Sequence, residues 1–145
     1  MSERVVFTIG YEGRGIDALV DVLRSADVEL LVDVRLHAMS RKPGFSRRRL
    51  GEALGSAGID YLHEPRLGNP KDNRPGFAAG DPESHGRYLR RLDDEARPAY
   101  DAVVQLVTER PVALLCFEAD HRSCHRTCIT QRMRADDPSL RVLDL

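Results

Sequence analysis

The sequence lacks any apolar stretch long enough to cross a membrane, and its N-terminus, Met1-Ser2-Glu3-Arg4, lacks the basic-then-apolar layout of a signal peptide. Its three cysteines are odd in number and clustered late in the chain, which argues against the disulfide framework of a secreted protein. We therefore expect a cytoplasmic protein with no membrane partner.

A strong charge of either sign is also absent, because 22 basic and 23 acidic residues give a net charge of −1. The molecule as a whole is not a polycation, so affinity for phosphate or nucleic acid has to come from a local patch. Internal repeats, domain linkers and low-complexity segments are lacking as well. With 145 residues, 41% of them hydrophobic, the chain is expected to form one domain over residues 1–145.

Short apolar runs alternate with segments of helical periodicity. The runs predict strands at 5–9, 30–34, 58–63, 112–115 and 141–145. The periodic segments predict helices that begin near residues 16, 47, 85, 98 and 123. Because strands this apolar are typical of sheets covered on both faces, we predict a Rossmann-like, three-layer α/β fold with a mostly parallel sheet of about five strands and helices on both faces.

Residues 64–84, rich in proline and glycine, are predicted to form a long irregular loop. This segment contains Arg66, Lys71 and Arg74, so one hypothesis is a lid that closes over an anionic ligand. The alternative is a flexible insertion without a function.

Polar residues follow four of the predicted strands directly. Gly10 and Tyr11 follow the first strand, and the pairs that close the next three strands are Asp33 and Arg35, Tyr61 and His63, and Cys116 and Glu118. Ligands of open α/β sheets bind outside the carboxyl ends of the strands. The sequence therefore predicts one functional site at this edge of the sheet.

Reactive residue types are most concentrated at the end of the stretch from Val112 to Arg126, V-A-L-L-C-F-E-A-D-H-R-S-C-H-R. Cys124, beside His125 at the start of a predicted helix, is expected to ionise readily to a thiolate nucleophile. Glu118 or Asp33 would then transfer protons. These four residues are the predicted catalytic set, although Asp33 is equally well explained as a structural partner of Arg35 or of a backbone N–H.

Cys116 and Arg122 also have the C-x5-R spacing of phosphatase and rhodanese-type loops. The bulky and acidic residues between them argue against such a loop, because an anion has to fit there.

Residues 35–49 contain six basic residues and no acid. Three arginines follow Ser46, the predicted N-cap, although a helix N-terminus favours acidic residues. Either a bound phosphate or a solvated basic face explains this pattern, and Phe45 is available for stacking on a base. The predicted anion-binding residues are Gly10, Tyr11, Arg35, Ser40, Arg41 and Arg126. The glycine spacing at 10, 13 and 15 differs from the dinucleotide fingerprint, so NAD is not predicted.

Three functions remain open at this point. The first is an enzyme acting on a phosphate-bearing substrate, either a nucleotide or a nucleic acid. The second is a metal site built from His121, Cys124, His125 and Cys128, with Cys116 as a further ligand. The third is a nucleic-acid-binding module whose cysteines are simply buried. The sequence leaves the cofactor unknown.

Several motifs of the chain resemble those of the domain of unknown function 488 family and occur in the same order as in that family. They are Thr8-Ile9-Gly10-Tyr11, Val32-Asp33-Val34-Arg35 with Ser40-Arg41 and Phe45, Gly58-Ile59-Asp60-Tyr61 with Leu67-Gly68, and Leu115-Cys116-Phe117-Glu118 with Cys124-His125-Arg126. The resemblance spans nearly the whole chain. It implies an α/β fold and makes the motif positions candidate site residues, without naming a reaction.

Overall fold

The computed structural model describes residues 4–120, 122 and 124–145. Its strands are β1 (Val5–Gly10), β2 (Leu30–Asp33), β3 (Asp60–His63), β4 (Val112–Cys116) and β5 (Arg141–Asp144). Its α-helices are α1 (Ile16–Ser25), α2 (Arg47–Ser56), α3 (Arg74–Ala78), α4 (Pro82–Asp93), α5 (Arg97–Glu109) and α6 (Arg126–Asp136). The alternation of strands and helices confirms the predicted fold class.

The five strands form one sheet in the order β3-β2-β4-β1-β5, and every pair is parallel. The central strand β4 pairs with β1 from Val6↔Val112 to Gly10↔Cys116. On its other side, β4 pairs with β2 as far as Asp33↔Leu115. This register brings the last residues of β1, β2 and β4 to one edge of the sheet.

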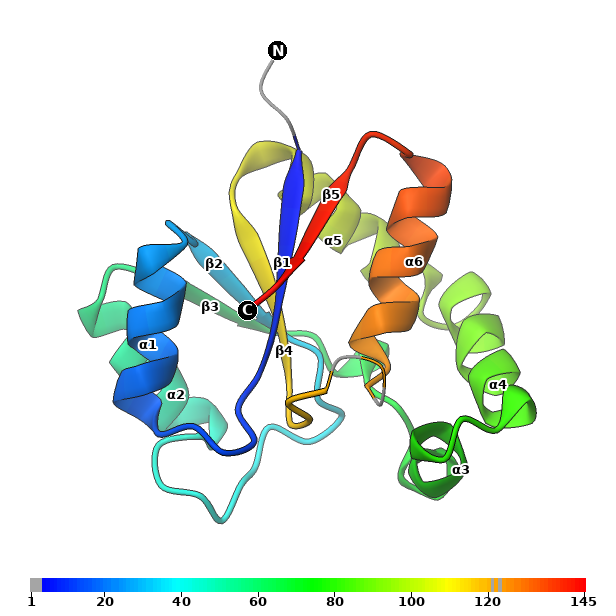
Figure 1. Cartoon of the computed structure of the whole chain (residues 1–145), viewed down its shortest axis with the longest axis horizontal. Coiled ribbons are helices and arrows are strands. Elements are labelled where there is room, and N and C mark those ends of the chain that lie inside the picture. The colour runs from blue at the N-terminus through cyan, green and yellow to red at the C-terminus, as the bar shows by residue number, and fades with distance from the viewer. Residues whose placement is uncertain (1–3, 121, 123) are drawn as a thin grey trace.

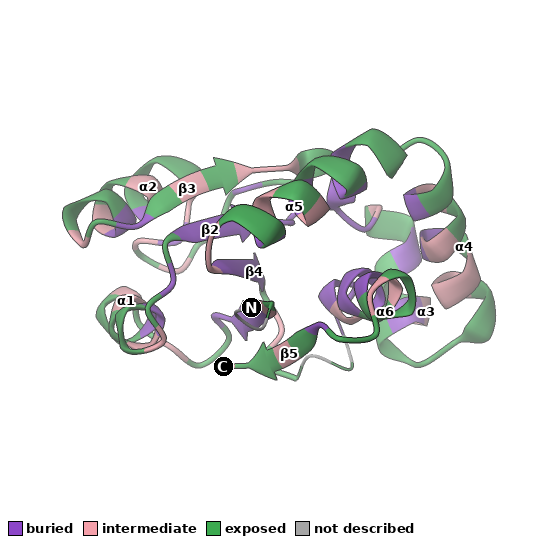
Figure 2. Ribbon diagram, turned by 90° about the horizontal axis from the view of Figure 1, so that it is seen from above, coloured by how far each residue is buried: buried purple, intermediate pink, exposed green. Residues whose placement is uncertain are grey.

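Helices cover both faces of the sheet (Figure 1). Alternate residues of the strands point to opposite faces, so Phe7 and Ile9 pack with the apolar sides of α1 and α2, whereas Val6 packs with α4, α5 and α6. Figure 2 shows the buried residues gathered on β2, β4 and the inner sides of the helices. The terminal strand β5 is a mostly exposed edge strand, as predicted.

After β4 the chain turns to one face of the sheet, whereas after its neighbours β1 and β2 it turns to the opposite face. The connections after β1 and β2 lead to α1 and α2 on one face, whereas the connection after β4 leads to α6 on the other. Loops that diverge in this way leave a crevice at the carboxyl edge, where ligands bind in α/β proteins.

The prediction of an irregular loop at 64–84 is wrong. This segment contains two 3₁₀ turns, Pro65–Leu67 and Lys71–Asn73, the short helix α3, and the first residues of α4, where Asp81 accepts a hydrogen bond from the Glu83 N–H. Buried anchors hold it in place, because Leu67 and Phe77 pack into the core and Tyr88 Oη donates to the Leu67 carbonyl at 2.6 Å. Proline and glycine in this segment lie mostly at the beginnings and ends of short helices.

The final helix α6 begins at Arg126, three residues later than predicted, and Ser123 lies outside the described residues. No helix among the described residues has the length and apolar character needed to span a bilayer.

Candidate active site at the carboxyl edge of the sheet

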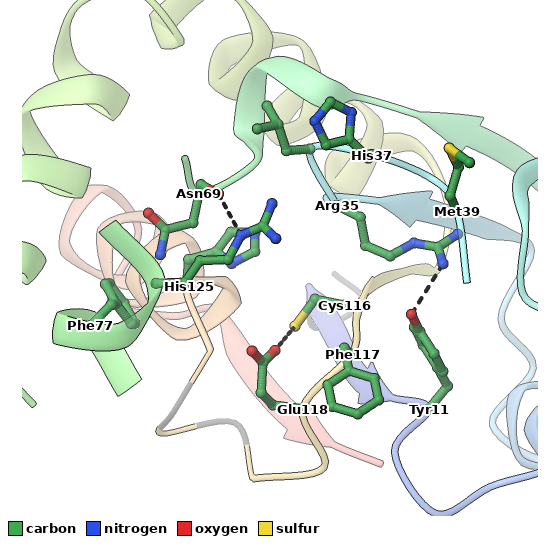
Figure 3. Close-up of a pocket in the computed structure, with 12 residues that line it drawn as sticks. Tyr11, Arg35, His37, Met39, Asn69, Phe77, Cys116, Phe117, Glu118 and His125 are labelled. Carbon is green, nitrogen blue, oxygen red and sulfur yellow. Dashed lines mark hydrogen bonds between the residues drawn. The ribbon is translucent and has the colours of Figure 1, made fainter. Parts of the chain in front are cut away.

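A cavity of about 380 Å³ lies at the carboxyl edge, a volume in the range of small-molecule sites (Figure 3). Its walls come from the segments after β1, β2, β3 and β4 and from the residue before α6. The lining residues are Tyr11, Arg35, Leu36, His37, Met39, Asn69, Arg74, Phe77, Cys116, Phe117, Glu118 and His125. Segments distant in sequence thus meet around one hollow.

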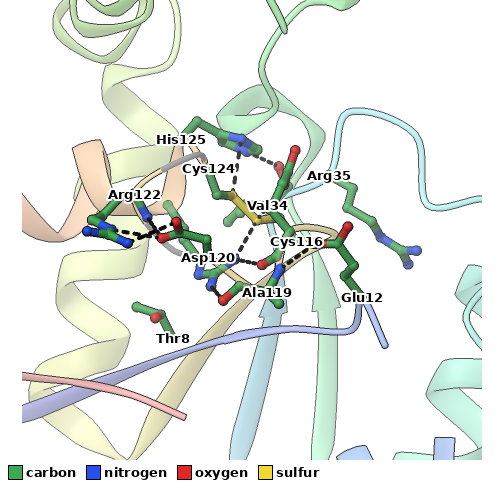
Figure 4. Close-up of a disulfide and its surroundings, with 12 residues drawn as sticks. Thr8, Glu12, Val34, Arg35, Cys116, Ala119, Asp120, Arg122, Cys124 and His125 are labelled. Carbon is green, nitrogen blue, oxygen red and sulfur yellow. Dashed lines mark hydrogen bonds and ion pairs between the residues drawn. A yellow bond between two sulfur atoms is a disulfide. The ribbon is translucent and has the colours of Figure 1, made fainter. Parts of the chain in front are cut away.

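The two cysteines of the reactive stretch are joined, since Cys116 and Cys124 form a disulfide (Figure 4). Cys116, the last residue of β4, lines the cavity, whereas Cys124 is not among the lining residues. Glu118 Oε2 lies 3.4 Å from Cys116 Sγ on the cavity side, and Arg126 Nη1 donates to the same sulfur at 3.0 Å. The sulfur that a ligand would meet is therefore that of Cys116.

The His125 ring is held between a carbonyl and a sulfur (Figure 4). Its Nε2 lies 2.8 Å from the Val34 carbonyl oxygen, which only accepts, so Nε2 carries the proton. Nδ1 is then left with a lone pair, 3.7 Å from Cys124 Sγ. Burial lowers the pKa of His125 to about 4, against the opposing effect of the Val34 hydrogen bond, so the ring is neutral near pH 7.

Arg126 is buried and holds the loop after β4 in place. Its Nη1 donates to the Glu118 carbonyl oxygen at 2.6 Å as well as to Cys116, and Nη2 donates to the Ala119 carbonyl at 3.3 Å. Burial lowers the pKa of Arg126, but a guanidinium stays charged at neutral pH. The geometry places Arg126 behind Cys116, whereas the sequence pattern predicted that it holds an anion directly.

Asp33 and Arg35 form a buried ion pair. Arg35 Nε donates to Asp33 Oδ1 at 2.8 Å and Nη2 donates to Oδ2 at 2.6 Å, while the Arg35 backbone N–H also reaches Oδ1. Tyr61 Oη adds a fourth donor to Asp33, at 2.6 Å. Asp33 is completely buried and does not line the cavity, so the structural interpretation of this carboxylate fits the geometry better than the catalytic one.

Most of the Arg35 donors are used inside the protein. Nη1 donates to Tyr11 Oη at 3.3 Å and to the Phe45 carbonyl at 2.7 Å, which leaves one Nη2 hydrogen without a partner among the described residues. Arg35 and Tyr11 do line the cavity, as predicted, but Arg35 is not a free fork for an anion.

Gly10 is required for packing. A Cβ on Gly10 would lie 1.8 Å from the Glu118 carbonyl oxygen, so only glycine lets the β4 loop approach β1. The Phe45 ring is fully buried and stacks on Tyr11 at a centroid distance of 4.5 Å, which makes the prediction that it stacks on a base wrong.

Ser40 and Arg41 lie outside the main cavity. They border a separate shallow hollow together with Lys42 and Arg49. Lys42 Nζ donates to the Tyr11 carbonyl at 3.0 Å, so this basic segment adjoins the cavity rim.

Sequence patterns did not single out His37 and Asn69, which also line the cavity. The sequence pattern assigns Arg74 only to the hypothetical lid at 64–84. Its Nε donates to the Asn69 carbonyl at 3.0 Å, and within residues 4–120, 122 and 124–145 its two Nη atoms have no hydrogen-bond partner. The three basic residues between 66 and 74 could have indicated Arg74 as an anion-binding residue. No feature of the neighbouring sequence indicates that Asn69 lines a cavity.

The predicted metal-ligand set is only partly brought together. Ligand atoms of Cys116, Cys124 and His125 lie within 4.8 Å of one another. Cys128 instead faces His85 Nδ1 at 4.0 Å, and burial raises the pKa of its thiol to about 11. His121 lies outside the described residues.

Fold and site together define a parallel, three-layer α/β protein with a cavity at the carboxyl edge that polar and apolar side chains line, among them Cys116. The family model described as "Domain of unknown function DUF488" matches residues 15–133. The chain belongs to this family, as its motifs suggested. Neither the curated proteins nor the solved structures gave a match.

Proposed function

We propose that the protein is an enzyme that acts on a phosphate-bearing substrate of nucleotide size, with the Cys116 thiolate as its nucleophile. The main support is the environment of Cys116 Sγ, which has a cationic donor at 3.0 Å, a carboxylate at 3.4 Å and a cavity in front of it. An activated cysteine needs a positive neighbour, a proton acceptor and access to substrate. Arg126 and Glu118 supply the first two, and because Cys116 lines the cavity, reduction of the disulfide would give a substrate access to its sulfur.

Each neighbour has a separate role. Arg126 stabilises negative charge on Cys116 Sγ, and because it is buried behind the sulfur it does so without entering the cavity. The reduced Cys116 thiol donates its proton to Glu118. The thiolate then attacks phosphorus, the bond to the leaving oxygen breaks, and Glu118 returns the proton to that oxygen. Water next attacks the phosphocysteine, which releases phosphate and regenerates the thiol.

The walls of the cavity suit a nucleotide. Arg74 offers guanidinium donors to phosphate oxygens, and Arg35 offers its remaining N–H. At the rim, Phe117 is 46% exposed and Met39 is 78% exposed, which gives an apolar surface for a base or sugar. The adjoining basic segment, from Arg41 to Arg49, favours a substrate with more than one phosphate or a nucleic acid end.

This proposal moves the nucleophile from Cys124 to Cys116. Cys124 is not among the residues that line the cavity, and its Sγ is the atom to which Cys116 Sγ is bonded in the oxidised form. The disulfide form therefore has no nucleophile, and a thiol reductant restores it. Cys124 would be dispensable for turnover but required for oxidative inactivation.

The test is turnover of p-nitrophenyl phosphate and of nucleoside phosphates by reduced protein in the presence of a metal chelator. Replacing Cys116 with Ser should lower kcat by at least about 1000-fold, since it removes the covalent step. Cys124→Ser should keep activity and resist oxidation, and Cys128→Ser is the matched control because its thiol faces His85. Undiminished turnover in Cys116→Ser would refute the proposed nucleophile, and selective loss in Cys124→Ser would return that role to Cys124.

A further inference from the structure

The Cys116–Cys124–His125 cluster combines three side chains that are typical zinc ligands. Their ligand atoms all lie within 4.8 Å of one another, and all three residues are buried. Two thiolates and one imidazole are the protein ligands of a catalytic type of zinc site, in which the fourth position is open. Since Cys116 and His125 also line the cavity, an open position here would face it.

We infer that the reduced Cys116–Cys124–His125 cluster binds one zinc ion per chain, and that the bound ion withholds the Cys116 thiolate from substrate. This inference adds regulation to the proposed function, but zinc binding itself needs neither substrate nor turnover.

The backbone spacing of the two cysteines suits a shared metal. Their Cα atoms are 7.2 Å apart, beyond the range of about 4.4–6.8 Å usual for a disulfide. Two thiolates on one zinc lie roughly 3.8 Å apart, given Zn–S bonds of about 2.3 Å in a tetrahedral site. Reduction would allow the two sulfurs to separate to this distance.

The His125 ring is already oriented as a ligand. Its Nε2–H donates to the Val34 carbonyl at 2.8 Å, so the lone pair on Nδ1 points to the cysteine side, 3.7 Å from Cys124 Sγ. A backbone carbonyl that accepts the other ring N–H is the usual outer partner of a metal-bound histidine. The second nitrogen is thereby left for the metal.

The charges around the cluster also balance. Two thiolates neutralise one zinc ion, and the N–H of Arg126 at 3.0 Å from Cys116 Sγ stabilises a metal-bound thiolate. On the cavity side, Glu118 Oε2 lies 3.4 Å from the same sulfur and offers a carboxylate oxygen for the fourth position. Cys128, next to His85, is outside the cluster.

Zinc binding requires the reduced state. A phosphine reductant supplies two electrons to the disulfide and becomes the phosphine oxide by taking oxygen from water, whose two protons go to the two sulfurs. Zinc then displaces both thiol protons, so one ion binds and two protons are released at most.

The experiment is titration of phosphine-reduced, metal-free protein with zinc, and with cobalt as a spectroscopic probe. Wild type and Cys128→Ser should bind one equivalent, and cobalt should give the visible bands of a tetrahedral site with sulfur-to-cobalt charge transfer. Cys124→Ser and His125→Ala should each weaken binding by more than about 100-fold, since they remove a direct ligand. Alkylation of Cys116 in wild type should slow when zinc is added, a measurement that does not depend on any variant folding.

Absence of zinc binding by reduced wild type, or undiminished binding by Cys124→Ser, would overturn the zinc site. Alkylation of Cys116 at the same rate with and without bound zinc would overturn its blocking role. The proposed function is judged separately, because its turnover assay contains a chelator and asks only whether Cys116 is needed.

Discussion

The buried Asp33–Arg35 pair gives the sharpest prediction about what holds the site together. Replacing Arg35 with Met removes four side-chain hydrogen bonds and leaves the Asp33 carboxylate, which is 0% exposed, with only Tyr61 and a backbone N–H as donors. Removing one partner of a buried ion pair costs about 3–5 kcal/mol. A domain of this size has roughly 5–15 kcal/mol of total stability, so the variant should fold but unfold at much lower urea.

The assay is equilibrium urea unfolding, with Arg48→Met as the matched control. Arg48 forms the same kind of pair with Glu52, but the side chains are 91% and 57% exposed. Exposed pairs of this kind contribute about 0–1 kcal/mol, so the control should change stability little.

A double variant, Asp33→Leu with Arg35→Met, tests the coupling between the two residues. Its loss of stability should be smaller than the sum of the single losses by at least about 1 kcal/mol, because neither charge is left alone. Additive losses, or an Arg35→Met variant as stable as Arg48→Met, would refute the structural role of the pair. Arg35 would then be free to hold a ligand.

Three further predictions concern single residues. Cys128, with its pKa raised to about 11, should be alkylated far more slowly at pH 8 than Cys116 in reduced protein, because Cys116 lines the cavity beside the Arg126 guanidinium, as peptide mass spectrometry would show; equal rates would contradict the raised pKa of the Cys128 thiol. Gly10→Ala should cost several kcal/mol or displace the Glu118 loop, because the new methyl would lie 1.8 Å from the Glu118 carbonyl; unchanged thermal stability would be inconsistent with that close approach. The pKa of His125 in the folded protein, about 4, lies below its ordinary value of 6.5. The neutral His125 ring therefore contributes fully to the free energy of unfolding above pH 6.5, and up to about 3 kcal/mol of that contribution is lost as pH falls toward 4. Urea unfolding of metal-free protein at pH 7 and pH 4.5 would measure this loss, and a His125→Asn variant with the same pH dependence would contradict the assignment.

The cysteine pair links the two proposals about function. Cys116 Sγ lies beside a cavity, a carboxylate and a guanidinium, and both proposals make the chemical state of this sulfur the control of the site. Under these proposals, the disulfide and the zinc complex would both block the Cys116 sulfur, and only the free thiolate would react with a substrate. An enzyme of this design would be active only when it is reduced and free of metal.

Some features followed from local sequence alone. The buried runs of β1, β2 and β4 and the periodic apolar positions of α1 and α5 are short-range patterns, and these predicted the α/β fold class. The parallel arrangement followed because strands alternate with helices. The location of the candidate cavity also followed, since the carboxyl ends of parallel strands share one edge.

Helix boundaries and short helices were harder to predict. Within 64–84, proline and glycine suggested an irregular loop, yet packing of Leu67 and Phe77 into the core orders the segment into 3₁₀ turns and helices. Short helices have little intrinsic stability, and burial by distant parts of the chain decides whether they form.

What each polar residue does at the shared edge was decided by tertiary structure. The sequence predicted that Tyr11, Arg35, Cys116 and Glu118 would gather there, because each lies just after a predicted strand. It did not determine that β4 lies between β2 and β1, or that Cys116 rather than Cys124 faces the cavity. The same side chain becomes an ion-pair partner or a ligand group according to which atoms lie within about 3 Å of it, and those atoms come from segments distant in sequence.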